Sequence, residues 1–151
     1  MLKTRLMLTA LSIMLLGVLV GCAGASGGEG ESSGGVALRI TGNVDNEMAW
    51  TEDQVRSMNT IDAQRENKEG EMSTYTGVPI RALLDQSGVS EDAAMVSFVA
   101  EDEYTADVEL TEVQTCEHCI VSFRNQGGFS IVMPGYSGKL QVKGVVEIQV
   151  E

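Results

Sequence analysis

The sequence has few basic side chains, few aromatic side chains and a single histidine. Its 10 Lys and Arg residues are outnumbered by 22 Asp and Glu residues, so the formal net charge is −12. This excess of acid argues against binding nucleic acid, or an anionic membrane surface, through charge. Because only 5% of residues are aromatic, the core must be built from aliphatic side chains and Met. The lone histidine, His118, gives no basis for a Ser/His/Asp or Cys/His set, and we assign no catalytic residue.

Three cysteines are too few for a closed four-cysteine metal site within one chain. Two of them, Cys116 and Cys119, form a C-x-x-C pair, and Ile120 stands where haem attachment would need histidine. The pair can form a structural disulfide, act as a redox-active dithiol, or bind a metal together with His118. It precedes an apolar strand, whereas a thioredoxin-type pair opens a helix. Outside the cytoplasm a local disulfide is the ordinary expectation, and we assign no metal ligands.

The N-terminus has the features of a targeting segment. Lys3 and Arg5 precede an uncharged, mostly apolar run over residues 6–20, which is short for a spanning helix and typical of a secretory signal. Gly21 then stands directly before Cys22, as in a bacterial lipoprotein processing site. The resemblance implies removal of residues 1–21, lipid such as palmitate on Cys22, and an extracytoplasmic domain anchored to the cell membrane. An ordinary signal peptide with an incidental cysteine is the alternative.

Residues 22–35 are rich in Gly and Ser and offer nothing to bury, so we expect a tether that gives the lipid-anchored domain reach. The folded domain is expected to span residues 36–151. It opens with alternating apolar residues at Val36–Ile40, a pattern that predicts a half-buried strand.

A helix start is predicted at Thr51, whose side chain can cap the helix while Gln54 bonds back to it. Trp50 is expected to pack against Val55 as a hydrophobic staple. The polar stretch over residues 60–74 is less distinctive and can be two strands joined by a turn.

A strand-to-helix corner at residues 75–84 is the strongest local pattern. Gly77 permits a sharp bend, and Pro79 suits the first helical position because its missing N–H would be unpaired there. Gly88 supplies a left-handed helix end. The apolar residues between them recur at helical spacing on one face: Ile80, Leu83 and Leu84.

Downstream of the corner the pattern is rich in strands. Residues 95–100 are apolar on both faces, which predicts a central strand, and Glu101–Glu103 reads as a solvated hairpin turn rather than a cation site. A short helical turn capped by Thr111 follows, and the remaining apolar runs predict strands at residues 120–123, 129–133 and 142–150. The fold class is therefore α+β, mixed and sheet-rich, with few short helices.

The loop that follows Pro134 can bring backbone close to an anion. Gly135 and Gly138 leave room for such an approach, and Lys139 and Lys143 supply positive charge. The plain alternative is a connection between two strands whose lysines are solvated.

Taken in order, these stretches resemble the molybdopterin-binding domain of the sulfite oxidase type of oxidoreductases. The resemblance covers residues 37–150, implies molybdopterin as the cofactor, and implies that the Gly/Lys loop helps to hold its pyranopterin. The candidates for holding such an anionic ligand are Arg81, Lys139 and Lys143. The resemblance rests on short matches in the family's order: Thr41-Gly42-Asn43-Val44, Thr51 to Val55, Tyr75 to Ile80 with Leu83-Leu84, Tyr104, Val132-Met133-Pro134-Gly135, and Lys143 to Ile148.

One family feature is missing. Family enzymes bind molybdenum through a cysteine thiolate before the corner, whereas residues 60–74 contain no cysteine and carry Gln64, Arg65 and Glu66 at about that place. The arginines and histidine that grip the cofactor phosphate in catalytic members have no clear counterparts here. We therefore expect a minimal form of the domain, whose standing as an enzyme rests on resemblance alone.

Three functional hypotheses follow. The first is a membrane-anchored module that binds a ligand or partner and lacks standard molybdenum catalysis. The second is a redox protein that serves a membrane electron-transfer chain, with a membrane redox protein as partner, through Cys116 and Cys119 or an unusual molybdopterin cofactor. The third is a structural or adhesive surface module.

Overall fold

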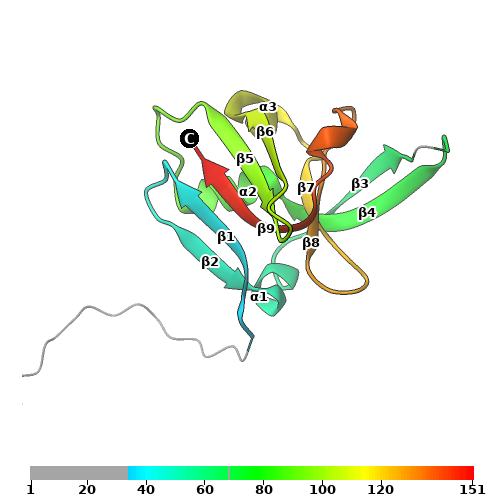
Figure 1. The fold of residues 1–151 in the computed structure, drawn as a ribbon, viewed down its shortest axis with the longest axis horizontal. Coiled ribbons are helices and arrows are strands. Elements are labelled where there is room, and N and C mark those ends of the chain that lie inside the picture. The colour runs from blue at the N-terminus through cyan, green and yellow to red at the C-terminus, as the bar shows by residue number, and fades with distance from the viewer. Residues whose placement is uncertain (1–33, 68) are drawn as a thin grey trace, which may run out of the picture. The chain divides into compact units, whose positions relative to one another are not determined.

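The structure is a computed structural model that describes residues 34–67 and 69–151. The predicted signal peptide, Cys22 and most of the predicted tether lie outside these residues. The described part contains nine strands, three short α-helices and one 3-10 helix (Figure 1), which confirms the sheet-rich α+β fold. In chain order the elements are β1 (Val36–Gly42), β2 (Met48–Thr51), α1 (Glu52–Arg56), β3 (Ile61–Glu66), β4 (Met72–Pro79), α2 (Ile80–Ser87), β5 (Met95–Ala100), β6 (Thr105–Glu109), α3 (Leu110–Thr115), β7 (Ile120–Phe123), β8 (Phe129–Val132), η1 (Gly138–Leu140) and β9 (Lys143–Val150).

The strands form one mixed sheet in the order β2-β1-β9-β8-β7-β4-β3, and β5 also pairs with β9 and carries β6 on its other side. The start of β9 runs antiparallel to β8, and its later residues lie between parallel β1 and antiparallel β5. Strand β9 therefore joins two parts of the sheet. We call β1, β2, β5, β6 and the later residues of β9 the β5 half, and we call β3, β4, β7 and β8 the β7 half.

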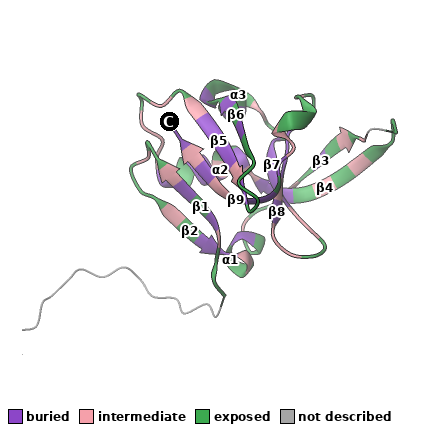
Figure 2. Ribbon diagram, in the orientation of Figure 1, coloured by how far each residue is buried: buried purple, intermediate pink, exposed green. Residues whose placement is uncertain are grey.

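The main hydrophobic core takes side chains from every strand of the β5 half, together with the buried sides of the three α-helices. One face of the β7 half contributes to the same core, for example through Val121 and Ile131. A second, much smaller cluster contains Ala63, Ile120 and Val132. Figure 2 shows the difference, since buried residues gather on β1, β5 and β9 while the outer part of the β3–β4 hairpin is mostly exposed.

The predicted corner is present, with two differences in detail. Gly77 lies inside β4, where an added Cβ would collide with the Val121 carbonyl oxygen and lie 2.6 Å from the Ser122 Cα, so glycine serves close strand approach rather than a bend. Pro79 still pairs with β7 in extended conformation and is the N-cap, so the helix begins one residue later, at Ile80.

Helix α2 has the predicted apolar face and the predicted end. Ile80, Leu83 and Leu84 are buried in the main core. Gly88 has φ 68° and donates its N–H to the Leu84 carbonyl oxygen at 3.1 Å, which confirms the left-handed C-cap.

The capping box that opens α1 is also confirmed. The Gln54 N–H donates to Thr51 Oγ1 at 3.3 Å, and the Thr51 N–H donates to Gln54 Oε1 at 2.8 Å. Trp50 and Val55 are buried in the same core. The sequence did not predict strand β2, because its four residues end on the cap residue itself and only Trp50 and Thr51 are buried.

The ambiguous residues 60–74 form part of a β3–β4 hairpin, in which Asn67 Oδ1 accepts the N–H groups of Glu69 and Glu71 at 3.0 and 2.8 Å.

The prediction that Thr111 caps helix α3 is wrong. Helix α3 begins at Leu110 with Glu109 as its N-cap and has no side-chain cap, and the Leu110 N–H donates to the Ala94 carbonyl oxygen at 2.9 Å. No helix in the described part of the chain is long and apolar enough to cross a membrane.

Candidate functional site

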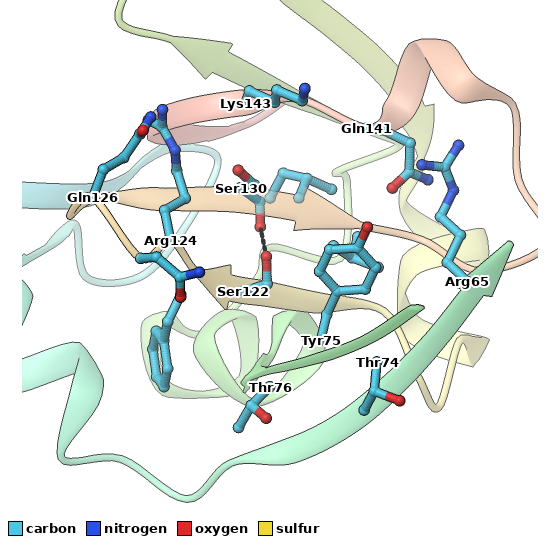
Figure 3. A pocket seen from close by; sticks show the side chains of 14 residues that line it. Arg65, Thr74, Tyr75, Thr76, Ser122, Arg124, Gln126, Ser130, Gln141 and Lys143 are labelled. Atoms are coloured by element: carbon cyan, nitrogen blue, oxygen red, sulfur yellow. Dashed lines mark hydrogen bonds between the residues drawn. The ribbon is translucent and has the colours of Figure 1, made fainter. Parts of the chain in front are cut away.

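A cavity of about 780 Å³ opens on the β7 half of the sheet (Figure 3). Its volume lies in the range of small-molecule sites in proteins. Strands β3, β4, β7 and β8 contribute residues, and the loop after β7 and the segment that enters β9 complete the lining. The lining residues are Arg65, Thr74, Tyr75, Thr76, Ser122, Phe123, Arg124, Asn125, Gln126, Ser130, Ile131, Val132, Gln141 and Lys143.

Strand register places a common set of side chains on the cavity face. Ala63 on β3 pairs with Tyr75 on β4, and Ser122 on β7 pairs with Ser130 on β8. Side chains alternate along a strand, so Arg65, two residues after Ala63, shares the face of Ala63 and Tyr75. The small hydrophobic cluster includes Ala63, and Tyr75 packs against it, so apolar packing lies directly beside the polar lining.

The cavity is basic although the chain is acidic. Arg65, Arg124 and Lys143 line it, and none of the described lining residues is Asp or Glu. The only ion pair within the described residues joins Arg56 and Glu52, so none of the three lining cations forms a salt bridge there, although the Glu101 carboxylate lies beside the same glycines as Arg124. We call this cavity the basic pocket.

Arg65 is half-buried on β3 and points into the basic pocket from one side (Figure 3). Its Nη2 atom lies 3.8 Å from the position that a Cβ on Gly138 would take, so the guanidinium lies beside η1. Arg65 stands in the stretch where the family's metal-binding thiolate is expected. A guanidinium has only hydrogen-bond donors and is a poor metal ligand, so this position suits an anion.

Arg124 enters the basic pocket from the loop between β7 and β8. Its Nη1 atom lies 3.4 Å from the Cβ position of Gly144 and 3.8 Å from that of Gly128. The Glu101 carboxyl carbon is also 3.5 Å from the Cβ position of Gly144, but no ion pair joins it to Arg124 in the described residues. The sequence analysis did not identify Arg124 as a candidate site residue. Its only distinguishing feature in the sequence is that it stands between a predicted strand and a predicted turn.

Two side chains of α1 fasten the loop that carries Arg124. Glu52 Oε2 accepts the Gly128 N–H at 3.1 Å, and Arg56 Nη2 donates to the Arg124 carbonyl oxygen at 3.2 Å. Arg56 also pairs with Glu52 at 2.7 Å and lies over the Phe123 ring, 4.7 Å from its centroid. The loop is thus held at both ends by one helix.

The pKa of the Glu52 carboxyl lies below its ordinary value. The main cause is the hydrogen bond from the Gly128 N–H, which stabilises the carboxylate, and the hydrogen bond from Arg56 acts in the same direction. The charged form of Glu52 is therefore the one that holds the loop.

Of the three residues predicted to hold an anion, only Lys143 lines the basic pocket. Lys139 is exposed on η1, where its carbonyl oxygen accepts the Tyr104 hydroxyl at 3.0 Å. Arg81 is exposed in the first turn of α2. The structure thus does not bring the three residues together at this cavity.

The segment between β8 and β9 is braced by Gln141. Its Nε2 donates to the Met133 carbonyl oxygen at 2.9 Å, and its Oε1 accepts the Met133 N–H at 3.4 Å. These bonds occupy the Gln141 amide. It supports the wall of the basic pocket and has few groups left for a ligand.

Cys116 and Cys119 form a disulfide in the structure. Cys116 is half-buried and Cys119 is 1% exposed. The Cys119 carbonyl oxygen accepts the Ile80 N–H at 3.0 Å, so the disulfide loop is attached to the start of α2. His118 is exposed and lines a separate cavity of about 360 Å³ with Asp62, Gln64 and Pro134.

No group of three His, Cys, Asp or Glu side chains in the described residues could hold a metal ion. The acidic turn Glu101–Glu103 forms the predicted hairpin connection between β5 and β6.

Comparisons with known proteins agree with this architecture. The chain matches the family model of the oxidoreductase molybdopterin binding domain over residues 33–151. Its structure is similar to the sulfane dehydrogenase SoxCD from Paracoccus pantotrophus, with a TM-score of 0.65 and 16% identity. That match covers 75% of this chain and 37% of the other, so this chain spans little more than a third of its neighbour, and at this identity the likeness shows the fold alone. No curated protein sequence matches the chain. The family match covers most of the sequence, and the chain therefore belongs to the family of oxidoreductase molybdopterin-binding domains.

Proposed function

We propose that this domain is an extracytoplasmic, lipid-anchored module that binds an anionic ligand in the basic pocket, without molybdenum catalysis through a protein thiolate. The single observation that carries the proposal is the set of three cations without a salt bridge in the described residues, Arg65, Arg124 and Lys143, around one cavity of an acidic chain. Like charges that share a cavity repel one another, and a bound anion relieves that repulsion.

The residue types favour an anion with oxygen acceptors. Each guanidinium offers several N–H donors in a fixed plane, which suits carboxylate, sulfate or phosphate groups. Arg65 and Arg124 are both half-buried, so bonds to them are less exposed to water than bonds on the open surface. The acidic remainder of the chain repels anions, so binding should be local to the basic pocket.

The residues present fit only part of the molybdenum cofactor. The basic side chains would suit the anionic phosphate of a pyranopterin. Among the described residues, however, the basic pocket has no Cys, His, Asp or Glu in its lining, and the two described cysteines are joined in a disulfide elsewhere. The donor set therefore does not fit a protein-ligated molybdenum, and we derive no chemical step through one.

The lipid anchor is proposed from Lys3, Arg5, the apolar run and Gly21-Cys22. In cells that express the whole chain, the protein should incorporate labelled palmitate and fractionate with membranes, and Cys22→Ser should abolish both. Labelling that persists in the Cys22→Ser variant would contradict the anchor. An unlabelled but secreted protein would support the ordinary signal peptide.

Elemental analysis of protein purified from its native host tests the proposed loss of molybdenum chemistry. We expect molybdenum and tungsten far below one atom per chain, and stoichiometric metal would overturn that part of the proposal. Thermal unfolding with a panel of phosphate, sulfate and carboxylates tests the anion site. At least one anion should raise the Tm of the wild type and not of a variant with Arg65→Gln, Arg124→Gln and Lys143→Gln.

Arg39→Gln is the matched control for charge, because Arg39 is exposed on β1 and lies outside the basic pocket. It should respond to the anion as the wild type does. If no anion stabilises the wild type, or if all variants respond equally, the proposed binding site is wrong.

A further inference from the structure

We infer that the ligand of the basic pocket is a small two-ended dianion, with one negative group bound by Arg65 and the other by Arg124. This inference rests on the proposed function and adds the charge distribution of the ligand. It follows from where the two guanidinium groups lie and from what lies between them.

The two arginines reach the cavity from separate parts of the fold. Arg65 comes from β3 and lies near Gly138 of η1, whereas Arg124 comes from the β7–β8 loop and lies near Gly128 and Gly144, with the Glu101 carboxylate beside the same two glycines. Figure 3 shows them entering from opposite sides, with Tyr75 between them. A ligand with one negative group for each guanidinium would engage both arginines at once.

Each arginine is half-buried rather than free in open solvent. An added Cβ on Gly138 would come within 3.8 Å of Arg65, and an added Cβ on Gly144 would come within 3.4 Å of Arg124. Gly144 also has φ 70°, a conformation that side-chain-bearing residues rarely adopt. The loop of Arg124 is further fixed by the bonds from Glu52 and Arg56 described above.

The region between the two arginines suits an uncharged spacer. Tyr75 packs against the small apolar cluster, and Ser122 Oγ already donates to the Ser130 carbonyl oxygen at 3.1 Å. None of the described lining residues places a carboxylate there. A short aliphatic or aromatic spacer can contact these groups without leaving a charge unpaired. Lys143 supplies a third cation and adds to the attraction for a doubly negative molecule.

Titration calorimetry at low salt with the purified full-length protein provides the test. The probes are two series of increasing spacer length, α,ω-dicarboxylates and α,ω-bisphosphonates, each with its single-ended counterpart of equal length. We expect affinity to peak at one spacer length, where the two-ended probe binds about tenfold or more tighter than its single-ended match, because a second charge-assisted contact forms within the same complex.

Arg65→Gln and Arg124→Gln should each remove that advantage and leave affinity close to that of the single-ended probe. Arg39→Gln should retain it, and thermal unfolding should show that all three variants fold. A wild type that binds single-ended anions as tightly as two-ended ones, with only one arginine required, overturns this inference and leaves the proposed anion site standing. Absence of any anion binding to the wild type overturns both.

Discussion

The two halves of the sheet differ in what they bury. In the β5 half, strands β1, β5 and β9 pack buried aliphatic and aromatic side chains into the main core. In the β7 half, one face joins that core while the other has only the small cluster of Ala63, Ile120 and Val132 beside the basic pocket. Most of the stabilising apolar packing therefore lies in the β5 half. The basic pocket lies on the face of the β7 half that has the least apolar packing, where polar and charged side chains remain accessible.

The largest expected effect tests this separation directly. Ile148 on β9 and Ile120 on β7 are both fully buried, but Ile148 lies in the main core and Ile120 in the small cluster. Truncation of a buried Ile to Ala costs about 2–5 kcal/mol of unfolding free energy. Ile148→Ala should fall near the top of that range. Ile120→Ala should fall near the bottom, because its cluster is small and its partner Val132 lines the cavity, so the surroundings can relax.

Urea unfolding of the two variants measures the difference, with Ile148→Val and Ile120→Val as milder changes in case an alanine variant fails to fold. Equal losses at the two positions would show that the β7 half is packed as tightly as the β5 half, and the comparison would fail.

The sequence carried enough information for the β5 half except strand β2, and for the corner. Helical spacing of Ile80, Leu83 and Leu84 predicted the buried face of α2, and Thr51 with Gln54 predicted the capping box, because both signals are local. The exact role of Gly77 could not be predicted, since it depends on the backbone of β7 more than forty residues later.

The basic pocket was not predictable for a related reason. Arg65, Arg124 and Lys143 lie on different strands and loops, and only the pairing of β4 with β7 and of β8 with β9 brings their segments together. Sequence reasoning chose Lys143 because glycines and a second lysine lie near it. Lys139 was grouped with Lys143 because the two are close in the chain, and Arg81 was added because it lies at the corner.

Loss of the disulfide, which lies outside the sheet, should have the next largest effect. It tests whether stability can change without a change in anion binding. Cys116→Ser with Cys119→Ser should lower the unfolding free energy by about 2 kcal/mol, because a cross-link over so short a loop restricts the unfolded chain only modestly. Binding of anions in the basic pocket should not change, since neither cysteine lines it.

Denaturation and calorimetry of the double variant, with dithiothreitol-treated wild type as the chemical control, check both parts. A reversible redox titration in the wild type that is lost in the variant, together with loss of electron transfer to a membrane redox partner, would favour the second functional hypothesis over a purely structural disulfide.

The smallest expected effect concerns Glu52, which connects α1 to the loop of the basic pocket. Its pKa is lowered in the folded state, so its contribution to stability is present above the ordinary carboxyl pKa and is lost as pH falls through the lower folded value. Glu52→Gln should therefore cost under about 1 kcal/mol near neutral pH and nothing at strongly acid pH, since the side chain is about one third exposed.

Unfolding of the wild type and of Glu52→Gln between about pH 7 and about pH 3 measures this dependence, and Asp53→Asn, an exposed carboxylate in the same helical turn, is the matched control. Glu52→Gln keeps an oxygen that can accept the Gly128 N–H, so it removes the charge and retains the hydrogen bond to the loop. A weaker affinity for two-ended anions in this variant, with single-ended anions bound at Arg65 unaffected, would show that α1 sets the position of Arg124. An unchanged affinity for both kinds of anion would show that Glu52 contributes to stability alone. The position of Arg124 would then be set by the glycine-rich turn of its own loop.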